Sequence, residues 1–116
     1  RIVHKHSKSN GEDMRFLIAL FLFAMPFVAN AGDLNCVGGV LLVLDHPTEC
    51  DGNMAFKTTA SNQKWICPAS DKGNAIILTA ITSGKVLDVY IDDQGGTITC
   101  STLPHYVQAK YIILNR

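Results

Sequence analysis

The chain has 116 residues, with 10 basic and 10 acidic side chains, so its formal net charge is zero. A neutral chain produces no long-range field that would steer it to nucleic acid, which disfavours a nucleic-acid-binding protein. The length suits one domain, because two halves would each be too small to bury a self-sufficient core.

An apolar run without charges spans residues 16–29, FLIALFLFAMPFVA. It is shorter than the roughly 20 residues that a membrane-spanning helix needs. Met14 and Arg15 precede the run, and Ala29-Asn30-Ala31 ends it with the small side chains that signal peptidase requires. This order of charge, apolar core and small residues predicts a signal peptide over residues 14–31.

The signal peptide divides the chain into three parts. Residues 1–13 are polar and form either an upstream segment or an extended start of the signal. Cleavage before Gly32 leaves a single mature domain, residues 32–116, with six basic and eight acidic side chains and a net charge of −2. We therefore expect a secreted or periplasmic protein that is not held by the membrane after cleavage.

Four cysteines lie in the mature part: Cys36, Cys50, Cys67 and Cys100. An even number of cysteines in a short exported chain predicts two disulfide bonds. Their spacing contains no C-x-x-C pair, so we expect no metal site. Of the three possible pairings we favour Cys36–Cys50 with Cys67–Cys100, because the first closes a loop the size of a hairpin.

Apolar runs and turn signals predict strands over residues 39–44, 54–59 and 64–67. Residues 71–83 contain β-branched side chains that favour a strand, but a capping residue precedes them and Gly84 follows, as at the ends of a helix. We expect a helix of about three turns there. The glycine pairs at 38–39 and 95–96 are expected in turns.

Three further strands are predicted over residues 86–91, 97–101 and 107–114. The order is then three strands, one helix and three strands. This order is typical of a mainly β fold with one helix, a small OB-like Greek-key barrel stapled by disulfides, or of a compact α+β sheet.

The stretch from Cys67 to Leu114 resembles a group of small exported bacterial proteins. The shared pattern is a cysteine, a helix end that reads ILTAITSGK at residues 77–85, a strand at 86–91, Cys100 and the closing run KYIIL at 110–114. The group is similar to the B subunits of subtilase-cytotoxin-type AB5 toxins. The resemblance implies an OB-fold, export, a glycan or protein partner, and a homo-oligomer, which is a pentamer in the toxins.

Two positions depart from the toxin subunits, which bind sialylated glycans. A hydroxyl residue that contacts sugar in those subunits corresponds to Gly38 here. The second tyrosine of a Tyr-Tyr pair, also a sugar contact, corresponds to Ile91, which follows Tyr90. The resemblance therefore implies the fold and export more directly than it implies sugar binding.

No pattern of catalytic residues stands out. The mature part has only two histidines, His46 and His105, no G-x-S-x-G motif and no spare thiol once two disulfides form. Three carboxylates and His46 gather within residues 45–51, but no second cluster supplies further ligands, so we interpret them as a solvated loop. We expect no enzymatic activity and no cofactor.

Aromatic side chains are the best candidates for a binding site. Trp65 and Tyr111 lie within apolar runs, and we expect them in the core. Four other residues are predicted to bind a partner, Tyr90 and Asp88 on the polar face of one strand and Tyr106 and His105 in a loop. The expected function is a small binding domain for a glycan or a protein. The alternative is a monomeric periplasmic inhibitor or accessory protein of a cell-envelope enzyme.

Overall fold

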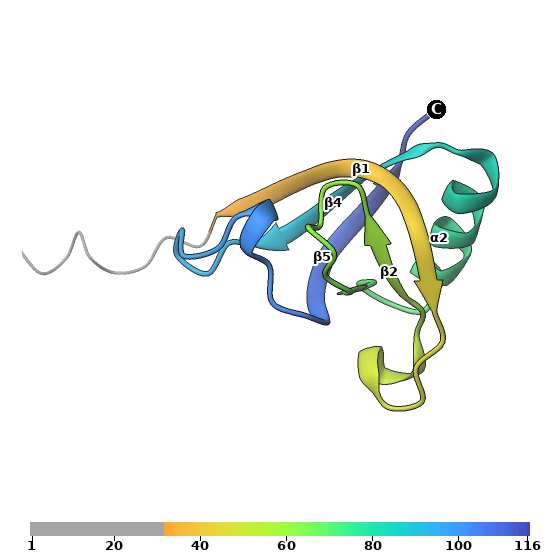
Figure 1. Ribbon diagram of the computed structural model, residues 1–116, viewed down its shortest axis with the longest axis horizontal. Helices are drawn as coiled ribbons and strands as arrows, with labels where there is room; N and C mark the ends of the chain where they lie inside the picture. The colour runs from red at the N-terminus through yellow and green to blue at the C-terminus, as the bar shows by residue number, and fades with distance from the viewer. Residues whose placement is uncertain (1–31) are drawn as a thin grey trace, which may run out of the picture. The chain divides into compact units, whose positions relative to one another are not determined.

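The computed structural model describes residues 32–116, so the predicted signal peptide and upstream segment lie outside the described residues. In this part, no helix is long and apolar enough to cross a membrane. The elements of the described part are β1 (Asp33–Leu44), η2 (Glu49–Gly52), β2 (Ala55–Thr58), β3 (Ile66–Cys67), α2 (Lys72–Ser83), β4 (Val86–Asp92), η3 (Cys100–Thr102) and β5 (Val107–Leu114). Figure 1 labels α2 and the four longer strands.

The strands close into a ring in the order β1-β2-β3-β5-β4. The pair β3–β5 is parallel and the other pairs are antiparallel. The ring is not a regular barrel, because β3 has only 2 residues. The predicted fold class, mainly β with one helix and stapled by disulfides, is confirmed, with the strands closing into a ring rather than a regular barrel.

The long, curved β1 joins two sides of the ring (Figure 1). Its residues up to Gly39 pair with β4, whereas those from Val40 onward pair with β2. The strand begins at Asp33, earlier than the prediction of 39–44, and it includes Gly38 and Gly39, which are therefore not in a turn.

The core fills the ring with alternate side chains of the strands. Leu87, Val89 and Ile91 of β4 are at most 1% exposed, and Phe56 of β2 is fully buried. The helix α2 adds Ile77 and Ala80 to the same cluster. Because strand side chains alternate between the two faces, the residues between these core positions point outward and form the surface of the ring.

The helix predicted over residues 71–83 is confirmed as α2. It ends at Gly84, whose backbone has a φ of 70° and donates its N–H to the Ala80 carbonyl. The hydroxyls of Thr79 and Thr82 donate to carbonyls one turn earlier, at Ala75 and Leu78. Hydroxyl residues are thus accommodated in the helix by bonding its own backbone.

The predicted disulfide pairing is wrong. The bonds are Cys36–Cys100 and Cys50–Cys67. Cys36 lies in the first half of β1 and Cys50 lies beyond its far end. The strand between Cys36 and Leu44 spans roughly 26 Å at 3.3 Å per residue, whereas a disulfide joins Cα atoms about 6 Å apart. The stiff strand β1 therefore keeps Cys36 away from Cys50, although the segment between them has a suitable length in sequence for a disulfide loop.

The strand predicted over residues 97–101 is also wrong. The segment folds into turns and the short helix η3. The Thr99 N–H donates to the Thr102 hydroxyl at 2.8 Å, and the Thr99 side chain accepts from the same turn. Such local bonds compete with a strand ladder, and the Cys36–Cys100 bond ties the turn to β1 instead.

Candidate functional site

A row of side chains crosses the outer surface of the ring at β2 and β3. Phe56 and Ile66 pair with each other and point into the core, so Lys57 and Trp65 lie opposite each other on the outside. The Lys57 Nζ atom lies 4.6 Å from the centroid of the Trp65 ring. Leu42 of β1 pairs with Lys57 and extends the row.

The loop between β4 and β5 adds His105 and Tyr106 to this row. The Trp65 N–H donates to His105 Nδ1 at 3.3 Å, and the Tyr106 N–H donates to the Trp65 carbonyl at 2.7 Å. Tyr106 has a φ of 61°, which is uncommon for a residue other than glycine. Two segments about 40 positions apart in the sequence are thus joined by one backbone-to-side-chain bond and one backbone-to-backbone bond.

The loop between β1 and β2, residues 45–54, adds His46. Its ring packs edge-on against Tyr106, with centroids 5.7 Å apart. The Cys50–Cys67 disulfide ties this loop to β3, and Cys67 Sγ lies 3.5 Å from the Tyr106 carbonyl oxygen. We call the surface formed by Lys57, Trp65, His46, His105 and Tyr106 the aromatic platform.

The two histidines of the platform use the same ring nitrogen to accept backbone N–H groups. His46 Nδ1 accepts the backbone N–H groups of Thr48 and Glu49 at 3.1 and 3.2 Å, and His105 Nδ1 accepts the N–H of Trp65. In the neutral ring the proton is then on Nε2. With Lys57, the histidines make the platform rich in hydrogen-bond donors, which suits a ligand rich in acceptors.

The carboxylates near His46 do not form a metal centre. Among residues 32–116, no group of three or more histidine, cysteine, aspartate or glutamate side chains is arranged to hold a metal ion. Asp45 and Asp51 are exposed. The backbone bonds of His46 Nδ1 show instead that this side chain organises the turn after β1.

The structure divides the four predicted binding residues into two pairs. His105 and Tyr106 belong to the platform, whereas Tyr90 and Asp88 lie on the outer side of β4. Tyr90 stacks on Tyr111 with ring centroids 4.5 Å apart. Asp88 accepts a hydrogen bond from Asn115 Nδ2 at 2.7 Å. The four residues therefore do not form one site.

The prediction that Trp65 and Tyr111 lie in the core is wrong. Trp65 is half-buried on the platform, and Tyr111 is 42% exposed. Tyr111 pairs with Tyr90, but the next residue of β4, Ile91, pairs with Ala109, so one residue of β5 bulges. The bulge at Lys110 turns Tyr111 to the outer face.

A short polar network surrounds the exposed Tyr111. Lys110 forms an ion pair with Asp33, and this hydrogen-bonded contact lowers the pKa of Asp33 and raises the pKa of Lys110. The Tyr111 hydroxyl donates to Asp33 at 3.4 Å. Partial desolvation, followed by the Asp33 charge, raises the pKa of Tyr111. The network links β1 to β5 across β4.

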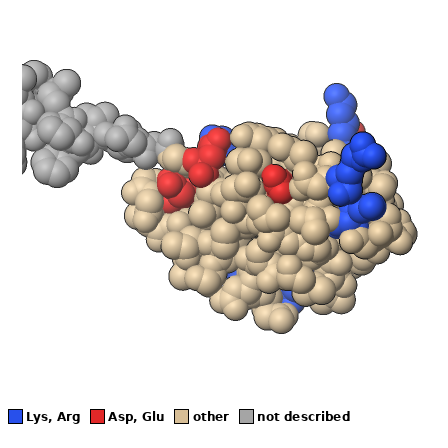
Figure 2. Space-filling model, turned by 90° about the horizontal axis from the view of Figure 1, so that it is seen from above, with Lys and Arg blue, Asp and Glu red and all other residues tan. Residues whose placement is uncertain are grey.

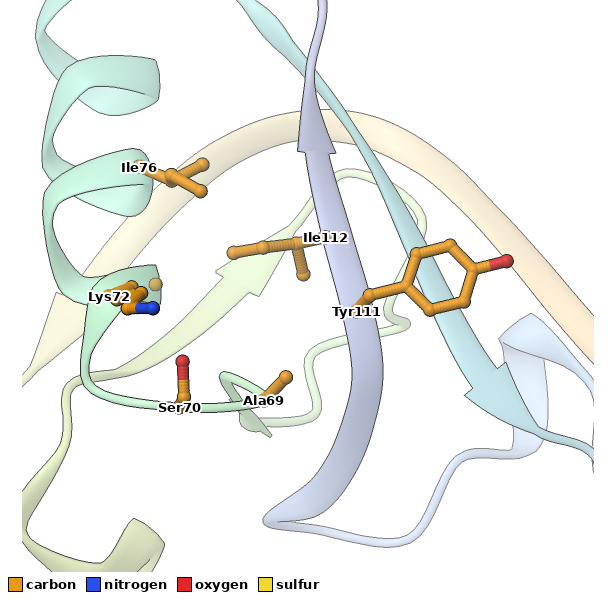
Figure 3. A pocket seen from close by; sticks show the side chains of 7 residues that line it. Ala69, Ser70, Lys72, Ile76, Tyr111 and Ile112 are labelled. Atoms are coloured by element: carbon orange, nitrogen blue, oxygen red, sulfur yellow. The ribbon is translucent and has the colours of Figure 1, made fainter.

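A pocket of about 150 Å³ lies between α2 and β5, lined by Ala69, Ser70, Lys72, Gly73, Ile76, Tyr111 and Ile112. In Figure 3 the side chains of Ile76 and Ile112 lie beside the pocket, whereas the ring of Tyr111 points to the other side of β5. Ligand pockets usually exceed roughly 300 Å³. This pocket is too small to be preferred over the platform.

Sequence reasoning missed Lys57, Trp65 and His46 as platform residues. Lys57 has a local signal, because it alternates with the apolar Phe56. Its meeting with Trp65 depends on the register Phe56↔Ile66, which joins separate segments. The position of His46 depends on the Cys50–Cys67 bond.

Gly38 and Ile91, the two positions that the resemblance matches to sugar contacts of the toxin B subunits, do not lie on the platform. Ile91 is 1% exposed, and Gly38 lies within β1. Comparison with family models, with curated proteins and with solved structures finds no match to this chain.

Proposed function

We propose that this chain is an exported, non-catalytic binding domain that recognises a glycan on the aromatic platform. The observation that carries the proposal is the meeting of Trp65, His105 and Tyr106 on the outer surface beside Lys57. OB-folds bind oligosaccharides on the face of strands 2 and 3 and on the loops that follow strands 1 and 4. The platform occupies the same part of this fold.

The chemistry of the platform suits a sugar that carries a negative charge. Aromatic rings stack on the apolar faces of sugar rings, and the polar edges of His46 and His105 supply donors to hydroxyl groups. The Lys57 ammonium lies over the indole of Trp65 and attracts a carboxylate to the same spot. Sialylated glycans, which the resemblance to AB5-type B subunits also implies, are the first class to test.

Export and the lack of catalysis are parts of the same proposal. The predicted signal peptide and two disulfide bonds support an oxidising compartment. His46 and His105 both use Nδ1 to accept backbone N–H groups, so that nitrogen is occupied and does not act as a general base. These bonds give the histidines a structural role in holding the platform together.

The test measures binding of 3′-sialyllactose and lactose to the protein recovered after export in a bacterial host. Saturation-transfer NMR and calorimetry should detect 3′-sialyllactose, and Trp65→Ala should weaken its binding at least about tenfold. Lys57→Met should remove the preference over lactose. Tyr111→Ala is the matched control, because it removes an exposed ring from another face. If Trp65→Ala binds 3′-sialyllactose as the unaltered protein does and Tyr111→Ala does not, the platform is not the binding surface.

A further inference from the structure

Gly32, the expected first residue of the mature domain, is bound on both sides to Asp93, the residue that follows β4. The Gly32 N–H donates to Asp93 Oδ1 at 3.0 Å, and the Asp93 N–H donates to the Gly32 carbonyl at 3.0 Å. A Cβ atom on Gly32 would lie 2.8 Å from Asp93 Oδ2, so a larger residue would push the carboxylate away. The nitrogen at the predicted cleavage position is therefore in direct contact with a carboxylate 61 positions later.

The loop after β4 fixes the position of this carboxylate. The Gly96 N–H donates to Asp93 Oδ1 at 3.1 Å, and the Asp93 carbonyl accepts the N–H of Thr97 at 3.0 Å. The Cys36–Cys100 disulfide ties the far end of the loop back to β1. The Asp93 carboxylate is thus held in place by the backbone of its own loop and does not need to rearrange to meet Gly32.

The end of the molecule around Gly32 is acidic. Besides Asp93 it contains Asp33 and Asp92, which pair across β1 and β4, and Lys110, which forms an ion pair with Asp33. That ion pair is the one found among residues 32–116, so Asp93 has no cationic side chain as a partner in this part of the chain. Figure 2 shows acidic side chains gathered at the end where β1 begins. A further positive charge is therefore electrostatically favoured here.

We propose that cleavage before Gly32 places a positive α-ammonium group on Asp93, and that the resulting ion pair holds the start of β1 against the loop after β4. Signal peptidase makes this cut, so the ion pair rests on the export that is part of the proposed function. Hydrolysis breaks the C–N bond between Ala31 and Gly32. The water oxygen stays with Ala31 as part of its new carboxylate, and the released amine of Gly32 is protonated at neutral pH. The nitrogen is already 3.0 Å from Asp93 Oδ1 and does not need to move.

Cleavage then exchanges one kind of hydrogen bond for a stronger one. Before the cut, a neutral amide of Gly32 donates to the Asp93 carboxylate. After the cut, donor and acceptor are both charged, and such bonds are the stronger class. Chain ends fray unless they are tied down. The ion pair ties down the end that cleavage creates, so removal of the signal peptide completes the fold of the mature domain.

The ion pair gives stability a characteristic dependence on pH. The charged groups around Gly32 are Asp93 from the loop, Asp33 from β1, Asp92 from β4 and Lys110 from β5. A neighbouring carboxylate raises the pKa of an amine, and a free α-amino group titrates near about pH 8. The stabilisation is therefore complete below about pH 8 and is lost as the pH rises through the raised pKa of the folded state.

The reactivity of the amine gives a direct test. Mass spectrometry first identifies the first residue of the protein recovered after export, and then the rate at which limiting acetic anhydride acetylates the α-amine at pH 8. Asp93→Asn keeps an acceptor oxygen but removes the charge, so it should raise this rate several-fold. Asp92→Asn is the matched control, because Asp92 Oδ1 also accepts a backbone N–H, that of Gln94 at 3.0 Å. It should change the rate less than about twofold. Equal rates in Asp93→Asn and the unaltered protein would overturn the proposal.

Moving the charge by one residue tests the position of the ion pair. One alanine inserted before Gly32 keeps Ala29-Asn30-Ala31 as the cleavage sequence but makes the Gly32 nitrogen an amide again. At pH 7 the insertion should raise the unfolding equilibrium constant several-fold in the otherwise unaltered chain and leave it unchanged in Asp93→Asn, as measured by urea denaturation. Equal effects in both backgrounds would contradict the ion pair.

The outcomes separate the ion pair from the rest of the proposed function. A first residue other than Gly32 would overturn the ion pair together with the predicted cleavage position. A chain that begins at Gly32 but shows no effect of Asp93→Asn would overturn the ion pair and leave export standing. Binding of 3′-sialyllactose is measured on the platform, so its failure has no bearing on the amine.

Discussion

At the scale of single residues, the turn after β2 packs so closely on β1 that it requires glycine at position 38. The Thr59 N–H donates to the Gly39 carbonyl at 3.0 Å, and the Gly39 N–H donates to the Thr59 hydroxyl at 3.3 Å. A Cβ atom on Gly38 would lie 2.5 Å from Thr59 Oγ1 and 3.0 Å from the Ala60 nitrogen. A Cβ atom on Gly39 would meet nothing within 4 Å.

The same substitution, glycine to alanine, should therefore have a large effect on stability at one of these adjacent positions and a small effect at the other. Gly38→Ala should lower the free energy of unfolding by about 1–3 kcal/mol, because the turn must move away from β1. Gly39→Ala should change it by less than about 1 kcal/mol. Urea denaturation followed by Trp65 fluorescence measures both. Equal losses in the two variants would show that strand propensity, and not the close approach, decides the cost.

At the scale of elements, the disulfides replace strand pairing where the ring is weakest. β3 has 2 residues, and its ladder joins only one pair with β2 and two pairs with β5. The Cys50–Cys67 bond connects β3 to the loop that carries His46. The Cys36–Cys100 bond connects β1 to η3 and fixes the long loop before β5. Each bond thus holds one wall of the platform region.

Removing the two bonds separately should affect stability and binding differently. The sequence separations of 17 and 64 predict losses of about 3 kcal/mol for Cys50→Ala with Cys67→Ala and about 4 kcal/mol for Cys36→Ala with Cys100→Ala. The first pair of substitutions also frees His46 from Tyr106, so it should weaken binding of 3′-sialyllactose more than the second. Urea denaturation and calorimetry measure the two effects. A larger loss of binding without Cys36–Cys100 would contradict the role of the loop after β1.

The sequence of a single segment is enough to predict those elements whose residue pattern and end residues lie within that segment. The helix α2 and the strand β5 have the predicted positions, and β4 extends the predicted strand by one residue to Asp92. The predicted disulfide pairing is wrong because the partner of Cys36 depends on its position along the stiff strand β1. The strand at 97–101 failed because hydroxyl side chains bond their own turn. The exposure of Tyr111 depends on a bulge that forms only against β4.

The candidate site was predicted only in part, for the same reason. Tyr106 and His105 were found because they share one loop with Pro104. Trp65 was assigned to the core because its neighbour Ile66 is apolar, and the alternation of a strand puts such neighbours on opposite faces. The pairing of Ile66 with Phe56 decides whether Trp65 or Ile66 points outward. This pairing is not visible in the sequence of either segment alone.

At the scale of the whole molecule, the platform and the core are two sides of the same strands. Phe56 is fully buried, and its neighbour Lys57 lies on the platform. The cluster around Phe56 includes side chains from β1, β4, β5 and α2, so the described residues share one core. We expect such a ring to unfold in a single cooperative transition, in which the platform is lost together with the core.

Phe56→Ala tests this coupling. Removing the ring should lower the free energy of unfolding by about 3–5 kcal/mol, because it leaves a cavity among strands that cannot collapse without opening the ring. Circular dichroism reports the sheet, and the fluorescence of Trp65, the only tryptophan in the chain, reports the platform. The two signals should shift together to lower urea concentration. Leu78→Ala, at a position 43% exposed on α2, should change stability by less than about 0.5 kcal/mol. A fluorescence change that precedes the loss of the sheet would show that the platform unfolds independently of the core.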